Sequence, residues 1–178
     1  MTIKKNPVNT PLKIAAAAVF AALVFVATYS FVISIPATSG YFNLGETIIY
    51  TAALIFGPLT GALAGGIGAM TADVLLGYAQ FAPGTLAIKG IEGLIVGVLY
   101  QKLQKRIANR SISATIAIGI GGLEMVAGYF IYEQLVLGYP FALALAEVPF
   151  NMVQMLVGLV IAVPVVHAVF RIFPQLKR

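Results

Sequence analysis

The sequence predicts an all-α membrane protein, a six-transmembrane-helix bundle with its N- and C-termini in the cytoplasm. Hydrophobic residues make up 60% of the chain and charged residues only 10%, and the mean hydropathy is +0.97. About a quarter of the residues are charged in soluble domains, so this composition excludes that class. The chain contains no cysteine, which leaves neither a disulfide framework nor a thiolate metal site.

Six apolar stretches define the expected helices. A bilayer core about 30 Å thick is crossed by roughly 20 apolar residues of helix. The expected spans are residues 12–35, 42–56, 58–78, 83–100, 113–135 and 141–170. The second stretch is short for a span, so we expect it to be irregular at one end or to lie where the bilayer is thin. No connection is long enough to divide the chain, and residues 1–178 are expected to form one membrane domain.

The basic residues orient this bundle. All but one of the 11 lysines and arginines lie before the first span, between the fourth and fifth spans, or after the sixth. These residues are Lys4, Lys5, Lys13, Lys102, Lys105, Arg106, Arg110, Arg171, Lys177 and Arg178. The positive-inside rule places all three segments, and with them both termini, in the cytoplasm. The excess of basic over acidic residues therefore reflects the membrane topology, and nucleic acid is not an expected partner.

The acidic residues have a different distribution, since all six lie inside or at the ends of the expected spans. Most of them fall in the outward-facing half, together with Lys89, the one basic residue at membrane depth. Lys89 and Glu92 are one helical turn apart and share a helix face. Tyrosines and asparagines accompany them. The candidate substrate-binding residues are Asn43, Glu46, Asp73, Tyr78, Lys89, Glu92, Tyr129, Glu147 and Asn151.

Two interpretations of these buried charges are open. Ionisable groups at membrane depth are costly, so they usually face a cavity or one another and mark function. A pocket with aromatic walls and a few convergent polar groups would suit a small polar solute. Alternatively, Lys89 pairs with Glu92 or Asp73 for structural reasons, and acids at the outer helix ends meet headgroup water.

The first span carries a face of small residues. In "KIAAAAVFAALVF", residues 13–25, Ala18 and Ala22 share one face and Ala17 and Ala21 another, all in the cytoplasmic half. Small residues let helices approach closely in lipid. This surface could pack against another span of the same chain or against a separate membrane subunit.

The order of these features resembles the substrate-binding S component of energy-coupling factor (ECF) transporters. The resemblance covers essentially the whole chain and is most specific in "NLGETIIYTAALIFGPLTGALAGGIGAMTADVLLGY" and "APGTLAIKGIEGLIVG". It implies a multi-pass protein of the prokaryotic cell membrane that captures a vitamin or vitamin precursor from outside. The nearest pattern is the branch assigned to riboflavin, which also contains members assigned to hydroxymethylpyrimidine or pyridoxine.

The resemblance also implies partners. A transmembrane coupling subunit would contact Ala17, Ala18, Ala21 and Ala22, and two ATPase subunits would supply the energy. The chain itself has no G-x-x-x-x-G-K-[ST] loop to hold ATP, and neither a cofactor nor a metal ion is expected.

Two other functions are alternatives. An intramembrane enzyme would need a nucleophile and a base at the same membrane depth. The single histidine, His167, is expected at the cytoplasmic end of the last span, far from the carboxylates. The sequence also has no G-x-S-x-G motif. A self-sufficient proton-coupled carrier of a small polar solute is the second alternative, because the same carboxylates could relay protons. The resemblance favours the transporter subunit over both.

The clustered basic charges make the topology testable. A single cysteine introduced at Asn109 should react with a membrane-impermeant maleimide only from the cytoplasmic side, and one at Gly138 only from outside. The reverse labelling pattern would overturn the predicted orientation.

Overall fold

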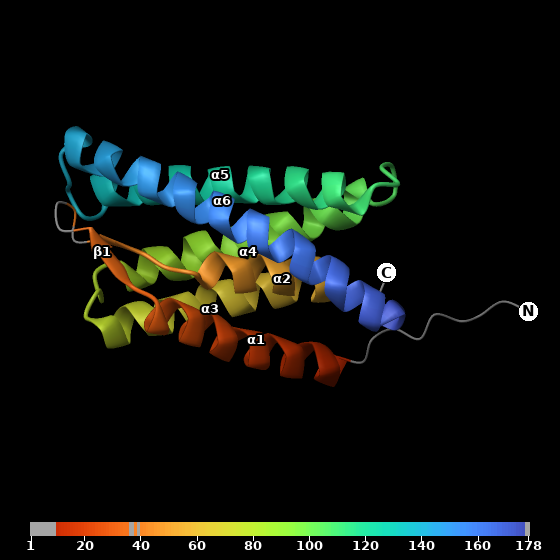
Figure 1. Cartoon of the computed structure of the whole chain (residues 1–178). Helices are drawn as coiled ribbons and strands as arrows, with labels where there is room; N and C mark the ends of the chain where they lie inside the picture. Colours follow the sequence, from red (N-terminus) through yellow and green to blue (C-terminus); the bar gives the residue numbers. More distant parts are fainter. Residues whose placement is uncertain (1–9, 36–37, 39, 177–178) are drawn as a thin grey trace, which may run out of the picture.

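The computed structural model describes residues 10–35, 38 and 40–176. Within them the chain forms α1 (Thr10–Ser30), β1 (Ile33–Ile35), β2 (Gly40–Phe42), α2 (Gly45–Phe56), α3 (Pro58–Leu76), α4 (Ala82–Leu103), α5 (Arg110–Leu135), α6 (Phe141–Ile172) and the short 3-10 helix η1 (Pro174–Leu176). Figure 1 shows the helices lying side by side along one common direction. The predicted six-helix bundle is therefore confirmed as a fold.

The second helix is not a full span. Five helices, α1, α3, α4, α5 and α6, are long and apolar enough to cross a membrane, whereas α2 has 12 residues. At 1.5 Å per residue α2 is about 18 Å long, well below the thickness of a bilayer core. The expectation of an irregular end is confirmed, because Phe42 belongs to a strand and the helix begins only at Gly45.

Helix α2 lies in the middle of the bundle (Figure 1). It packs against α1, α3, α4 and α6, and most of its residues are buried, including Ile49, Tyr50 and Ala53. A helix surrounded in this way buries residues on most of its circumference, and its few polar side chains, such as Glu46, must find partners inside the protein.

Glycines allow the close approach of α3 to its neighbours. A Cβ atom on Gly61 would lie 2.6 Å from the Ala53 Cβ and 2.8 Å from the Gly93 carbonyl oxygen, and one on Gly65 would lie 2.6 Å from the Lys89 carbonyl oxygen. Real side chains do not tolerate such distances. The glycine spacing in α3 and α4 thus serves packing inside the bundle, as small residues do between membrane helices.

A β-hairpin covers the end of the bundle opposite the two termini. Strands β1 and β2 pair antiparallel, with Ile33 opposite Phe42 and Ile35 opposite Gly40. In Figure 1 they lie at the same end as the α3–α4 and α5–α6 connections, and the chain termini and the α4–α5 connection lie at the other. The predicted first span to residue 35 is therefore too long, since α1 ends at Ser30.

Candidate functional site

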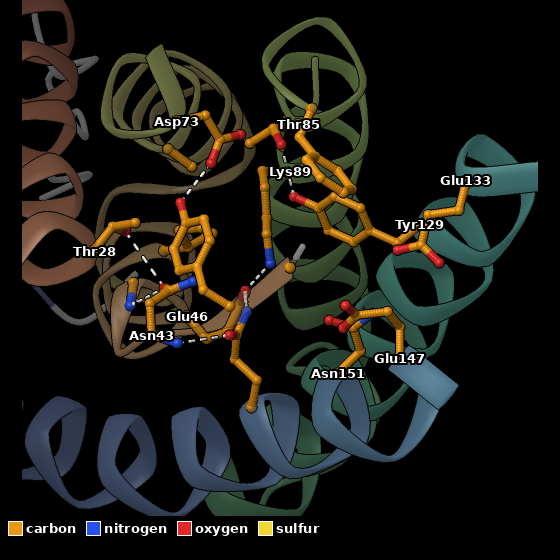
Figure 2. Close-up of a pocket in the computed structure, with 17 residues that line it drawn as sticks. Thr28, Asn43, Glu46, Asp73, Thr85, Lys89, Tyr129, Glu133, Glu147 and Asn151 are labelled. Atoms are coloured by element: carbon orange, nitrogen blue, oxygen red, sulfur yellow. Dashed lines mark hydrogen bonds and ion pairs between the residues drawn. The ribbon is translucent and has the colours of Figure 1, made fainter. Parts of the chain in front are cut away.

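A cavity lies at the hairpin end of the bundle, around the N-terminus of the short helix α2. All six α-helices and strand β2 contribute to its wall (Figure 2). The lining residues are Thr28, Gly40, Tyr41, Asn43, Gly45, Glu46, Ile49, Ala69, Asp73, Phe81, Thr85, Lys89, Tyr129, Glu133, Glu147, Asn151 and Gln154. Its free volume is about 40 Å³, room for only a few water molecules. The side chains of the lining residues thus leave only a narrow space.

Lys89 forms the charged floor of this cavity. Its Nζ donates to Oε1 of Glu46 on α2, and it lies 3.6 Å from Oε2 of Glu92, one turn further along α4. Tyr50 donates from its hydroxyl to the other Glu92 oxygen at 2.7 Å. All four side chains are almost fully buried. A lone charge at this depth would be costly, and pairing is what makes the cluster tolerable.

Gln154 fixes the start of α2 against α6. Its Nε2 donates to Glu46 Oε1 and its Oε1 accepts from the backbone N–H of Asn43, both at 2.9 Å. The Asn43 side chain in turn accepts from the N–H of Gly45 at 2.8 Å and from the hydroxyl of Thr28 on α1 at 3.4 Å. These bonds satisfy backbone groups at the irregular end of α2 that no helix partner reaches.

Aromatic residues and hydroxyls form the wall toward α3 and α5. Tyr41 on β2 donates its hydroxyl to Oδ1 of Asp73, and burial together with the Asp73 carboxylate raises the pKa of Tyr41, so the phenol stays protonated. Tyr129 shares a hydrogen bond of 2.9 Å with Thr85. The Lys89 ammonium lies 5.4 Å from the centre of the Tyr129 ring, within the range of a cation–π contact.

Two carboxylates define the side toward α5 and α6. Figure 2 shows Glu133 of α5 and Glu147 of α6 directed into the same part of the cavity. Thr38, between the two strands, donates its hydroxyl to Glu147, and a Cβ on Gly40 would collide with the same carboxylate. The hairpin segment therefore rests directly on Glu147, and Gly40 is needed for that close approach.

The cavity is rich in hydrogen-bond acceptors. Within the described part of the chain, Oε2 of Glu46, Oδ2 of Asp73 and Oε2 of Glu133 are buried and have no hydrogen-bond partner. Buried polar atoms are normally paired, because an unpaired one costs free energy. Three unpaired acceptors lining one cavity, beside a single ammonium group, favour a solute that carries several hydrogen-bond donors.

All but two of the sequence-predicted residues line this cavity: Asn43, Glu46, Asp73, Lys89, Tyr129, Glu147 and Asn151. Glu92 lies beneath the floor and contacts Lys89 and Tyr50. Tyr78 stacks on the Tyr41 ring, with centroids 4.6 Å apart, but does not line the cavity. Glu92 and Tyr78 lie outside the cavity because of the direction in which each side chain points and the position of the hairpin. The sequence pattern reveals neither.

The cavity is also lined by residues that the sequence pattern did not predict. Glu133 and Gln154 carried the same signal as the predicted ones, a polar side chain within an apolar span. Thr28, Gly40 and Thr85 carry no such signal, since small polar residues and glycine are common in membrane helices and turns. Only the fold brings them to the cavity.

These features define a class of protein. Within the described ranges, no group of three or more His, Cys, Asp or Glu residues could hold a metal ion, and His167 lies near Ser111 at the end of the bundle that carries the termini. A membrane bundle with a narrow cavity at one end, lined by unpaired hydrogen-bond acceptors, is suited to binding a small solute.

Comparisons with known proteins agree with this class. Residues 8–171 match the family described as "ECF-type riboflavin transporter, S component". The chain is 41% identical over 129 residues to an uncharacterised protein of Pyrococcus woesei, covering 72% of this chain and 82% of that protein. It is 32% identical over 151 residues to the thiamine precursor transporter HmpT of Lactococcus lactis, covering 84% and 82% respectively.

A solved structure has the same fold. It is described as the S component of a bacterial ECF transporter, and it superposes with a TM-score of 0.72 over 96% of this chain and 100% of its own, at 17% sequence identity. The chain belongs to the family of S components of ECF-type riboflavin transporters. It is thus a multi-pass membrane subunit that binds a vitamin or vitamin precursor, and it is not an enzyme.

The buried cluster around Lys89 should govern stability. Replacing Lys89 with Met leaves Glu46 and Glu92 without their cation, and removing one partner of a buried pair typically costs about 3–5 kcal/mol. We expect a clear fall in the unfolding temperature in detergent, followed by circular dichroism at 222 nm. The double variant K89M/E46Q should recover part of this loss, because it also removes one of the carboxylates.

Lys102→Met is the matched control, since Lys102 is exposed near the end of α4. It should unfold at the wild-type temperature. If Lys89→Met also does so, the cluster does not contribute to the stability of the bundle.

Proposed function

We propose that this S component binds a donor-bearing heteroaromatic solute of the hydroxymethylpyrimidine type, a precursor of thiamine, and delivers it to an ECF module. We infer the class of solute from three unpaired carboxylate oxygens around one narrow cavity, those of Glu46, Asp73 and Glu133. An amino group and a hydroxyl on a small flat ring can donate to such acceptors.

The size of the cavity and the sequence comparison support the smaller solute. The free volume of the site is about 40 Å³, so a single ring requires less rearrangement of the wall than a tricyclic flavin with a sugar-alcohol chain. The relative from Lactococcus lactis carries the name of a thiamine precursor transporter. Tyr41, Phe81 and Tyr129 supply aromatic surface for stacking against a planar ring.

The proposed orientation has the cavity outside and the termini in the cytoplasm. All of the described basic side chains except Lys89 lie at the bundle end with the termini, from Lys13 on α1 to Arg171 on α6. The positive-inside rule assigns that end to the cytoplasm. The cavity at the other end would then meet solute from outside.

Helix α1 is the proposed contact for the transmembrane coupling subunit. Only 17% of residues 13–30 are buried inside the bundle, compared with 50% for α3 and α4. Ala18 and Ala22 are exposed and Ala21 is half-buried, whereas Ala17 is 5% exposed and faces the interior. The surface open to a partner therefore contains Ala18 and Ala22, and two ATPase subunits would complete the transporter.

Solute binding tests the first part of the proposal. Isothermal titration of the purified protein should show tighter binding of hydroxymethylpyrimidine than of riboflavin. Glu133→Gln turns an unpaired acceptor into a group with a competing donor, so affinity for hydroxymethylpyrimidine should fall at least tenfold, about 1.4 kcal/mol. Glu124→Gln is the control, since Glu124 does not line the cavity, and it should bind like the wild type. Preference for riboflavin would contradict the proposed solute.

Uptake tests the contact through α1. Replacing Ala18 and Ala22 with Leu should leave solute binding by the isolated protein near the wild-type level, because both side chains are exposed. Co-purification with the coupling subunit and ATP-dependent uptake should be lost, since bulky residues prevent close helix approach. The control is A142L/A146L, an equally spaced exposed pair on α6. Full uptake by A18L/A22L would exclude this surface and favour a self-sufficient carrier.

A further inference from the structure

A second cavity lies at the opposite end of α2. Because α2 is about 18 Å long and α4, with its 22 residues, about 33 Å, space remains beyond the C-terminus of α2 among the ends of α4, α5 and α6. This cavity has a volume of about 420 Å³, far larger than the first. Leu54 and Ile55 of α2 and Phe170 of α6 form its apolar part.

The polar part of this second cavity is positive. Lys105 and Arg110 line it, and none of the described residues that line it is acidic. Arg110 is the first residue of α5, where the helix dipole adds positive potential. Its guanidinium lies 5.2 Å from the centre of the Phe170 ring, which holds the charge at the cavity.

Uncharged hydrogen-bond donors lie beside the two cations. Gln104 lines the cavity, and its Nε2 is buried without a hydrogen-bond partner in the described part of the chain. Tyr100, one turn earlier on α4, also lines it. Two cations, an unpaired amide and a phenol together match an anion with several acceptor oxygens, and a phosphate group is the common biological example.

The outer surface of α5 and α6 at this end of the bundle is apolar. Ile112, two residues after Arg110, is 49% exposed, and Ile172, two residues after Phe170, is 68% exposed. Both belong to helices long and apolar enough to span a membrane. The cavity therefore lies at the basic end of the bundle, among the ends of helices that are long and apolar enough to span a membrane.

We propose that this cavity binds an acidic phospholipid, with the headgroup phosphate between Lys105, Arg110 and Gln104 and the first part of an acyl chain against Leu54, Ile55 and Phe170. Basic pockets between membrane helices on the cytoplasmic side are suited to such headgroups. A soluble anion would use the cations but not the apolar part. The site is separate from the solute cavity and does not depend on which vitamin the protein binds.

Native mass spectrometry of the full-length protein tests this directly. After delipidation, the protein is titrated with dioleoyl phosphatidylglycerol or with dioleoyl phosphatidylcholine. We expect one phosphatidylglycerol to bind at least tenfold more tightly than phosphatidylcholine. The variant K105Q/R110Q should lose that preference. The variant Q104E adds a negative charge beside the groups proposed to bind the phosphate, and it should weaken phosphatidylglycerol binding at least fivefold.

The matched control is K102Q/R106Q. It removes the same net charge from the same end of the bundle, but neither residue lines the cavity, so the preference should persist. Binding of the vitamin-type solute at the other end verifies that each variant is folded. Lys105→Gln alone alters an exposed side chain and provides a reading even if Arg110→Gln unfolds the protein.

Three outcomes would overturn the proposal. Equal binding of the two lipids would show that no acidic lipid is selected. An equal loss in both double variants would indicate diffuse surface charge. Displacement of the lipid by inorganic phosphate or glycerol 3-phosphate at similar concentrations would assign the cavity to a soluble anion.

Discussion

The organisation of this protein depends on a buried helix that is too short to cross the bundle it belongs to. Helix α2 contacts four longer helices and stops well before their ends. At its N-terminus the neighbouring helices and strand β2 line the cavity with the acidic side chains, and at its C-terminus α4, α5, α6 and η1 line the basic one. A sixth full-length helix would fill both spaces with side chains. Both cavities thus exist because α2 is shorter than its neighbours. Non-helical backbone is tolerated at membrane depth only where protein covers it.

Charge is distributed in the same pattern. The acidic side chains lie around and beneath the solute cavity, where Lys89 pairs with Glu46 and contacts Glu92, and the remaining described cations lie toward the termini. Lys89 stabilises two carboxylates at once. Asp73 and Glu133 lie outside its reach, and each has one oxygen that accepts no hydrogen bond from a described residue. The structural ion pair and the polar pocket, which the sequence leaves as alternative interpretations, are therefore parts of one arrangement.

Much of this could be predicted from the sequence, because the bilayer imposes strong rules. The length of apolar runs predicts the five long helices, and charge at membrane depth identifies Glu46, Lys89 and Asp73. The hairpin could not be predicted in this way, since residues 33–35 are as apolar as the helix before them and the pairing partner lies beyond a turn. Ala17 illustrates a second limit: alanines of one helix differ in burial according to helix phase relative to the neighbours, which composition does not encode. Glu92 and Tyr78 do not line the cavity for similar reasons, because the rotation of a helix about its axis and the position of the hairpin decide which side chains face it.

The contact between the hairpin and Glu147 has a kinetic consequence. Thr38 donates to this carboxylate and the Gly40 backbone lies directly against it, while Tyr41 is bonded to Asp73 on the opposite wall. The segment is thus attached at two points across the mouth of the site. If the solute binds in the proposed cavity and passes this segment, both entry and exit require these bonds to break, and opening is then a shared barrier for association and dissociation. Under that condition, strengthening the attachment of the hairpin would slow association and dissociation alike and would leave the equilibrium affinity less changed than either rate.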